Sequence, residues 1–551
     1  MPLKAMPSET EPWPIQVKIT RTPRPKWHFP ARAKPDDLTC RTSVRKSNKT
    51  IARYGQTVFI KGGIMRAIQW TSISRAGLLA TALLSSAPVL AAESSGANEP
   101  ATPRNAAPKP RANPLRPGPP RYLDQYDYLA GTKPADKSML DKIRSIRIPA
   151  NSHLALGGGT RVRYEAFDNP DFGLTGIDAD NYYQFRADLY ADLHLFNDAT
   201  RTFVQVNDTQ SWDKQRPTPV DESDFELHQA FVDFNFARSP SGNSYLRFGR
   251  QQMVYGQGVL FTTRLVPNVR QTFDGFRLST TSDAGHSLDA FAVRPVNNLR
   301  TGSFNDSSQN AGNFYGLYGT LRWNPRLNQD LYALGLQRDQ RVLANQVGDE
   351  TRYTLGTRLF GTVSNLDYTI DLIYQTGQFN ERDISAWAVS SSYGYTWNDA
   401  PGHPGLALRI DAASGDDDLT DHTMKTFDPL FPSNGKFYGN GNYTTLANLI
   451  TIGPQGALAP VDWLTLFPTI YTLWKQKTQD GVYVPPYRTL PGTIGTEGRF
   501  IGTSYRMFAR WTPTDLITID LEYQYYDVDG AIKRAGGRDS QYVSTRFNIM
   551  F

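Results

Sequence analysis

The sequence predicts an all-β protein, a transmembrane antiparallel β-barrel of about 18 strands, and three observations support this fold class. From about residue 153 to the end, short segments alternate apolar and polar side chains and are separated by clusters of Asn, Asp, Gly, Pro and Ser. This period of two is typical of β-strands. The polar face of the segments is densely charged, as a wet lumen allows, and Tyr, Trp and Phe gather near their ends, as in the aromatic girdles of membrane barrels.

The clearest segment runs from residue 183 to 195. Its odd positions are Tyr, Phe, Ala and Leu, and its even positions are mostly charged or polar. A soluble β-sandwich shows the same alternation with the apolar face turned inward. The charged face, the aromatic ends and an export signal favour the membrane barrel. The chain also stops on a period-two strand ending at Phe551, which would let the last strand pair with the first.

Three segments precede the predicted barrel. Residues 65–91 have a cationic start, a short apolar core and a small-residue end, the organisation of a secretory signal peptide in a Gram-negative cell. Because a signal peptide normally begins a chain, residues 1–64 are interpreted as an extension from a start codon assigned too early; an unusual basic pre-extension is the alternative. Residues 92–120 are rich in proline and predict a periplasmic linker, and residues 121–551 form the predicted barrel.

Charge and cysteine content exclude several function classes. The full chain carries 59 Lys and Arg against 53 Asp and Glu, which taken whole suggests a nucleic-acid or membrane-surface partner. Residues 1–64 hold 13 of these basic and 4 of these acidic residues, and the signal segment holds two arginines. The chain from Ala92 onward therefore has 44 basic and 49 acidic residues, a net charge of −5, and nucleic acid is not expected as a partner. The single cysteine, Cys40, also lies upstream, so the mature chain has no disulfide framework and no thiol nucleophile.

Charged side chains should line the lumen, because they are costly against lipid. Two interpretations of the predicted luminal arginines stay open. One is a track that draws an acidic polymer or anion through the pore by guanidinium–carboxylate pairing; the other is an interior ladder of ion pairs with acids on the same face. Basic and acidic residues are nearly balanced there, so neither is preferred. The predicted pore-lining, anion-binding residues are Arg161, Arg163, Arg186, Arg247, Arg250, Arg270, Asp274, Arg277, Arg358 and Arg409.

The segment from residue 247 to 277 is the densest in arginine, with five arginines and Asp274 as its single acid. Its Gly256, Gly258 and Pro267 predict a chain that leaves the wall and folds into the lumen as a constriction. The segment resembles the signature of the alginate export family of outer-membrane barrels. The matching motifs are Gly-Arg-Gln at 249–251, Pro-Asn-Val-Arg at 267–270 and Phe-Asp-Gly at 273–275.

Further motifs at residues 158–165, 228–233, 413–416 and 427–432 agree with the same family, so the resemblance covers about residue 121 to 551 in order. Thr160 stands where the family pattern has an acid, and the proline-rich linker is not part of the family core. The resemblance implies a monomeric barrel of eighteen strands with an electropositive constriction. It does not imply alginate itself as the substrate.

No catalytic motif supports an enzyme. The sequence has no Gly-x-Ser-x-Gly elbow and no phosphate loop, and its histidines after the signal show no metal-binding spacing, so neither a cofactor nor a catalytic residue is expected. A barrel-embedded hydrolase is the enzyme alternative. A weak calcium candidate at the cell surface lacks regular ligand spacing, and a solvated external loop is its alternative. Its residues are Asp416, Asp417, Asp418 and Asp421.

The predicted function is an outer-membrane channel for an anionic solute, in particular the export of an acidic, alginate-like exopolysaccharide. A diffusive porin for small solutes is the alternative. The expected partners are outer-membrane lipid, an anionic polysaccharide or small anions, and periplasmic export components.

Overall fold

A computed structural model describes residues 120–124, 129, 137–238, 242–264, 266–308, 312–343 and 346–551. The extension, signal peptide and linker predicted at residues 1–64, 65–91 and 92–120 lie outside this part, apart from Pro120. No helix within the described residues has the length and apolar character needed to cross a bilayer.

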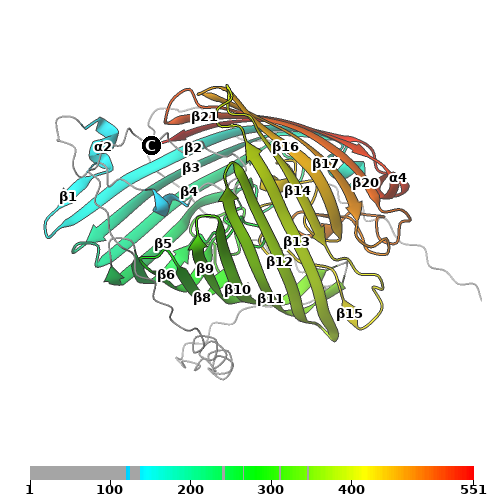
Figure 1. Ribbon diagram of the computed structural model, residues 1–551, viewed down its shortest axis with the longest axis horizontal. Helices are drawn as coiled ribbons and strands as arrows, with labels where there is room; N and C mark the ends of the chain where they lie inside the picture. Colours follow the sequence, from blue (N-terminus) through cyan, green and yellow to red (C-terminus); the bar gives the residue numbers. More distant parts are fainter. Residues whose placement is uncertain are drawn as a thin grey trace, which may run out of the picture. The chain divides into compact units, whose positions relative to one another are not determined.

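The described chain forms one antiparallel sheet that closes into an 18-stranded barrel (Figure 1). Wall strands that follow one another in sequence are paired, and the last, β22, pairs with the first, β2, so that Arg163 lies opposite Arg546. The predicted barrel, closed by its C-terminal strand, is confirmed. The wall strands are β2 (Ser152–Asp168), β3 (Ala179–Leu195), β4 (Thr200–Trp212), β5 (Ser223–Arg238), β6 (Asn243–Gln251), β7 (Phe273–Thr281), β8 (Ser287–Pro295), β9 (Asn313–Asn324), β10 (Leu327–Leu343), β11 (Gln346–Val363), β12 (Leu366–Phe379), β13 (Arg382–Thr396), β14 (Gly405–Ala413), β16 (Leu449–Val461), β17 (Leu464–Lys475), β20 (Phe500–Trp511), β21 (Ile517–Val528) and β22 (Ser540–Met550).

Short elements decorate the two ends of this wall. Before the wall begins, β1 forms a short antiparallel pair with β2. Among the connections, β15 pairs parallel with β13, and β18 pairs with β19 in a separate two-stranded sheet. The short elements are η2 (Arg121–Leu123), α2 (Met139–Ile143), β1 (Ile146–Ile148), η5 (Pro170–Gly173), β15 (Thr423–Met424), α3 (Asn434–Tyr438), β18 (Tyr483–Val484), β19 (Arg488–Thr489) and α4 (Gly530–Arg534).

The side chains of the wall alternate between a buried polar face and an exposed apolar face. On β3, Gln184 and Arg186 are buried, whereas Tyr183 and Leu189 are 49% and 56% exposed. A soluble protein would bury the apolar face instead, so this inversion is the pattern of a barrel whose outside faces lipid. The predicted strand faces are therefore confirmed.

Exposed tryptophans mark one rim of the barrel. Trp323, Trp397, Trp463 and Trp511 are all more than two-fifths exposed, and each lies at or next to the end of a wall strand. Tryptophan is favoured at the membrane–water interface because its ring is apolar and its N–H is polar. These tryptophans lie at the same end of the barrel as the short turns, such as residues 364–365. In bacterial outer-membrane barrels the end with the short turns faces the periplasm.

The longest connections, 252–272, 414–448 and 476–499, all leave the opposite end of the wall. The prediction that residues 247–277 leave the wall is narrowed by the structure. Residues 243–251 form β6 and 273–281 form β7, so the departing segment is the β6–β7 loop, residues 252–272. Arg247, Arg250 and Arg277 are consequently wall residues, because an arginine on the polar face of a strand needs no loop to reach the lumen.

Candidate functional site

The β6–β7 loop is anchored to the inner wall by one asparagine. The side-chain amide of Asn268 donates to the backbone carbonyls of Phe185 (2.9 Å), Gln210 (3.1 Å) and Asp221 (2.9 Å). Its side-chain oxygen accepts from Arg161 at 2.7 Å. Asn268 is fully buried, so these bonds replace water and hold the loop against β2 and β3.

The β14–β16 loop, residues 414–448, meets the β6–β7 loop inside the barrel. Phe261 and Phe431 form an isolated parallel bridge, with Phe431 donating to the Leu260 carbonyl at 2.8 Å and accepting from Thr262 at 3.0 Å. The Lys436 ammonium adds a bond to the Gln257 carbonyl at 2.5 Å. The two loops therefore form one connected unit within the barrel.

The β14–β16 loop is also tied to distant parts of the wall. On β10, Arg338 pairs with Asp428 of the loop. On β21, Glu522 accepts from the backbone N–H of Asn440 at 2.9 Å. Together with the Asn268 contacts on β2, β3 and β4, these bonds attach the two loops to several separate strands of the wall.

Three of the predicted arginines form what we call the arginine cluster: Arg161, Arg186 and Arg270. Arg161 and Arg186 lie directly opposite each other on β2 and β3. Arg161 donates to the Asn268 side chain, and Arg186 donates to the Asn268 carbonyl at 3.1 Å. Asn268 thus offers an uncharged acceptor to each of the two guanidinium groups and orients both.

The charges that surround Arg161 and Arg186 are mostly positive. Burial is the largest influence on Arg161, and the charges that act on it are Arg186, Arg163, Arg546 and Arg270. Asp188 acts on both Arg186 and Arg270, and Arg270 is also influenced by Arg121 and Asp124. Arg270 lies on the β6–β7 loop, and its side chain keeps only part of its exposure to solvent. This partial burial lowers the pKa of its guanidinium. An arginine remains charged despite such a shift, so the cluster brings three positive charges together on β2, β3 and the β6–β7 loop.

Six of the predicted arginines instead face a carboxylate. The most buried example is Arg247, which makes a bidentate pair with Asp233 at 2.7 and 2.8 Å and stacks on the ring of Phe231. The single acid of the arginine-rich segment, Asp274, is held by Arg250 at 2.8 and 3.0 Å. The remaining pairs are Arg163 with Glu165, Arg277 with Asp289, Arg358 with Asp330 and Arg409 with Asp411, at 2.6 to 3.0 Å.

A cavity of about 530 Å³ lies at the long-loop end of the lumen, and Val266 and Pro267 of the β6–β7 loop are among its lining residues. It is lined by the β6–β7 and β14–β16 loops and by the β2–β3, β4–β5 and β17–β20 connections. Its basic lining residues are Arg163, Lys214, Arg216, Arg264 and Arg488. Because Lys214 and Arg488 pair with Asp221 and Asp171, its walls are of mixed charge, unlike the arginine cluster.

A short N-terminal segment occupies the periplasmic side of the lumen. Tyr122 of η2 is buried against Phe203 and Phe231, and its hydroxyl donates to the Gln252 carbonyl at 3.0 Å. Arg121 donates to the Gly158 carbonyl at 2.8 Å and to the Phe551 carbonyl at 3.3 Å. We call residues 120–124 the strap, since they contact both sides of the seam between β2 and β22. The sequence did not predict the strap, because its two main contact residues, Arg121 and Tyr122, belong to no periodic pattern of apolar and polar side chains.

The weak calcium candidate is a set of paired carboxylates. Asp417 contacts Lys425 (2.5 Å) and Lys477 (3.1 Å), and these ammonium groups lower its pKa to about 2. Arg382 binds Asp416 at 3.0 Å and lies 3.5 Å from Asp421. Asp418 accepts from Thr420. The cations already engage the carboxylates that calcium would need.

Comparison with known proteins places this architecture. The alginate export family model matches residues 152–546, from the first wall strand into the last. The chain belongs to the alginate export family. The family resemblance seen in the sequence is thereby confirmed, and family and fold together identify an outer-membrane channel and point away from an enzyme.

The barrel of this alginate export family member also resembles solved porin-like structures. OccAB1 of Acinetobacter baumannii shares 11% identity at a TM-score of 0.51, over 75% of this chain and 99% of that one. OpdQ of Pseudomonas aeruginosa shares 13% identity at a TM-score of 0.48, over 72% of this chain and 97% of that one. At such identities the likeness concerns the fold alone. No curated protein matches the sequence significantly.

Proposed function

We propose that this alginate export family member passes an anionic solute across the outer membrane, and that the arginine cluster is the selectivity element. The single observation that carries the proposal is the placement of Arg161 and Arg186 directly opposite each other on β2 and β3, with both guanidinium groups bonded to Asn268 of the loop. In a narrow, partly desolvated passage such a field is screened less than at an open surface. Anions would be concentrated there.

The finer form of the proposal is export of an acidic exopolysaccharide of the alginate type. Guanidinium groups at successive depths could pair in turn with the carboxylates of such a polymer. The mixed-charge cavity at the long-loop end also supports export of an anionic polymer. An anion attracted by the arginine cluster would bind more weakly in this cavity and could leave the channel there. The six ion pairs of the wall then act as structural rungs, and only the arginine cluster provides selectivity.

A second function, diffusion of small solutes, is favoured by a different observation. The β6–β7 and β14–β16 loops cross the lumen and are bonded to each other and to the wall. A lumen narrowed by two anchored loops suits small solutes better than a polymer, unless the loops move.

Conductance in a planar bilayer tests the proposal. Under a KCl gradient the wild-type channel should have a reversal potential on the anion side, and Arg270→Gln should move it toward cation preference. The matched control is the double variant Arg250→Gln/Asp274→Asn, which removes one ion pair without changing the net charge and should leave the reversal potential unchanged. Cation preference in the wild type, unmoved by Arg270→Gln, would overturn the proposal.

Acidic oligosaccharides of increasing length separate the polymer from the small-solute interpretation. A polymer exporter should show current blockades whose duration grows with oligomer length, and Arg270→Gln should shorten them. A small-solute pore should admit monomers and dimers only, with no blockade by longer oligomers from either side.

A further inference from the structure

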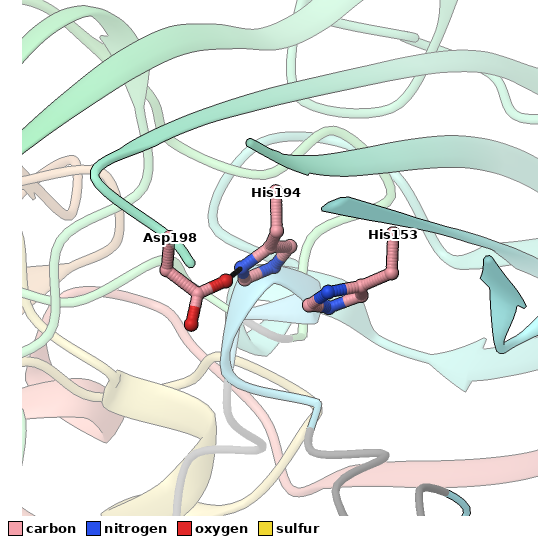
Figure 2. Close-up of side chains that lie close together, drawn as sticks. All are labelled: His153, His194 and Asp198. Atoms are coloured by element: carbon pink, nitrogen blue, oxygen red, sulfur yellow. Dashed lines mark hydrogen bonds and ion pairs between the residues drawn. The ribbon is translucent and has the colours of Figure 1, made fainter. Parts of the chain in front are cut away.

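Two histidines far apart in the sequence meet at the periplasmic rim of the barrel. His153 lies at the start of β2 and His194 next to the end of β3, and the strand register places them directly opposite each other. Their rings are stacked, with centroids 4.3 Å apart and an interplanar angle of 15°. Asp198, in the β3–β4 turn, points at the same place (Figure 2).

The three side chains bring metal-ligating atoms close together. One ring nitrogen of each histidine and one carboxylate oxygen of Asp198 all lie within 4.8 Å of one another. The Nδ1 atom of His194 is 2.7 Å from the carboxylate of Asp198. Ligands of a tetrahedral zinc ion lie roughly 3.3 Å apart, given bond lengths of about 2.0 Å. Binding an ion would require at least one imidazole to rotate out of the stack, so that both nitrogen lone pairs point at the ion.

A second carboxylate holds His194 in the orientation that a metal ligand needs. Asp192 lies 3.1 Å from Nε2 of His194, on the side of the ring away from Asp198. Asp192 is itself fixed by a bidentate pair with Arg201 at 2.7 and 2.8 Å. Metal-binding histidines usually donate their second ring N–H to such a carboxylate, which fixes the tautomer and makes the other nitrogen a better ligand.

The site can be reached from solvent. All three ligand residues are partly exposed, with the side chains of His194 and Asp198 at 20% and 36% exposure, whereas Asp192 behind them is at 8%. Two imidazoles and one carboxylate are donors that zinc and related divalent transition ions prefer. We propose that His153, His194 and Asp198 form a binding site for a divalent transition-metal ion, Zn²⁺ in particular, on the periplasmic rim.

Such a site would staple two wall strands to their turn. His153, His194 and Asp198 come from β2, β3 and the β3–β4 turn, next to the seam between β2 and β22. A bound ion would stabilise this edge of the folded barrel, because an ion that binds only the folded state adds to its stability.

Zinc titration of the untagged, folded full-length chain in detergent tests this proposal, with a chromophoric chelator as competitor. The wild type should bind one Zn²⁺ per chain. His153→Ala/His194→Ala should lose this binding, and Asp192→Asn should weaken it by about 10- to 100-fold. His403→Asn is the matched control, because it removes one exposed histidine from a turn at the same rim, and it should bind as the wild type does.

A measurement on the wild type alone covers the case in which the double variant does not fold. Zn²⁺ should protect His153 and His194 from diethylpyrocarbonate modification while leaving His403 reactive. Absence of stoichiometric Zn²⁺ binding in the wild type, equal binding by a folded double variant, or equal reactivity of the histidines with and without Zn²⁺ would each overturn the proposal. His194 would then be an imidazolium held between Asp192 and Asp198.

Discussion

The arginines of β6 and β7 and those of the arginine cluster lie on the same luminal face but have opposite surroundings. Arg247 and Arg250 each make a bidentate pair with a carboxylate of a neighbouring strand. Arg161 and Arg186 face each other and donate to Asn268 of the loop. The difference teaches that an arginine on a pore wall is not by itself a selectivity element. What matters is whether a carboxylate lies within reach, on the same strand as for Arg409 and Asp411 or on a neighbouring strand as for Arg247 and Asp233.

The largest effect should come from breaking a buried ion pair of the wall, that between Arg247 and Asp233. Asp233→Ala leaves the fully buried guanidinium of Arg247 without its carboxylate, and breaking a buried pair in this way costs about 3 to 5 kcal/mol. The fraction of heat-modifiable, folded barrel after refolding should fall sharply. The control is Arg247→Met/Asp233→Leu, which removes both charges and should recover much of the folded fraction. Normal folding of Asp233→Ala would show that the ion pair between Arg247 and Asp233 is not needed for the stability of the barrel.

A smaller effect should follow from releasing the loop that covers the arginine cluster. Asn268→Ala removes three hydrogen bonds to the wall and the acceptor of Arg161, a loss of about 2 to 4 kcal/mol of loop anchoring. Single-channel recordings should show a larger and noisier conductance, while the folded fraction stays near that of the wild type. Unchanged conductance would place the narrowest part of the pore elsewhere.

The smallest effect concerns the exposed loop around Asp417. Lys425 and Lys477 lower the pKa of the Asp417 carboxyl to about 2, from an ordinary value near 3.9 in an unfolded chain. A lowered folded-state pKa contributes stability that is present above about pH 4 and lost as the pH falls toward 2. Asp417→Asn should therefore speed hydrogen exchange at residues 416–425 above pH 4, corrected for intrinsic rates, and match the wild type near pH 2. Equal exchange at pH 6 would show that these ion pairs are too screened to matter.

Much of the fold could be predicted from the sequence. Alternate residues of a strand in a barrel wall face lipid and lumen, so the strand appears in the sequence as alternating apolar and polar residues. The faces of β3, the closing strand and the family followed from local patterns. The arginine cluster could not be separated from the rungs in advance. That Arg186 lies opposite Arg161 depends on the register between β2 and β3, and the contact of Asn268 with Gln210 depends on a loop folding back over more than 50 residues of chain. The meeting of His153 and His194 was missed for the same reason, since metal-binding spacing in sequence says nothing about cross-strand neighbours.

The strap has a consequence for the seam between β2 and β22. Arg121 binds carbonyls of Gly158 and Phe551, which come from opposite sides of the seam, and Tyr122 rests on Phe203, Phe231 and Gln252. Gly158 lies on β2, and Phe551 directly follows β22. The full set of strap contacts therefore requires β2 and β22 to lie side by side, so the strap bridges the seam as well as covering part of the inner wall.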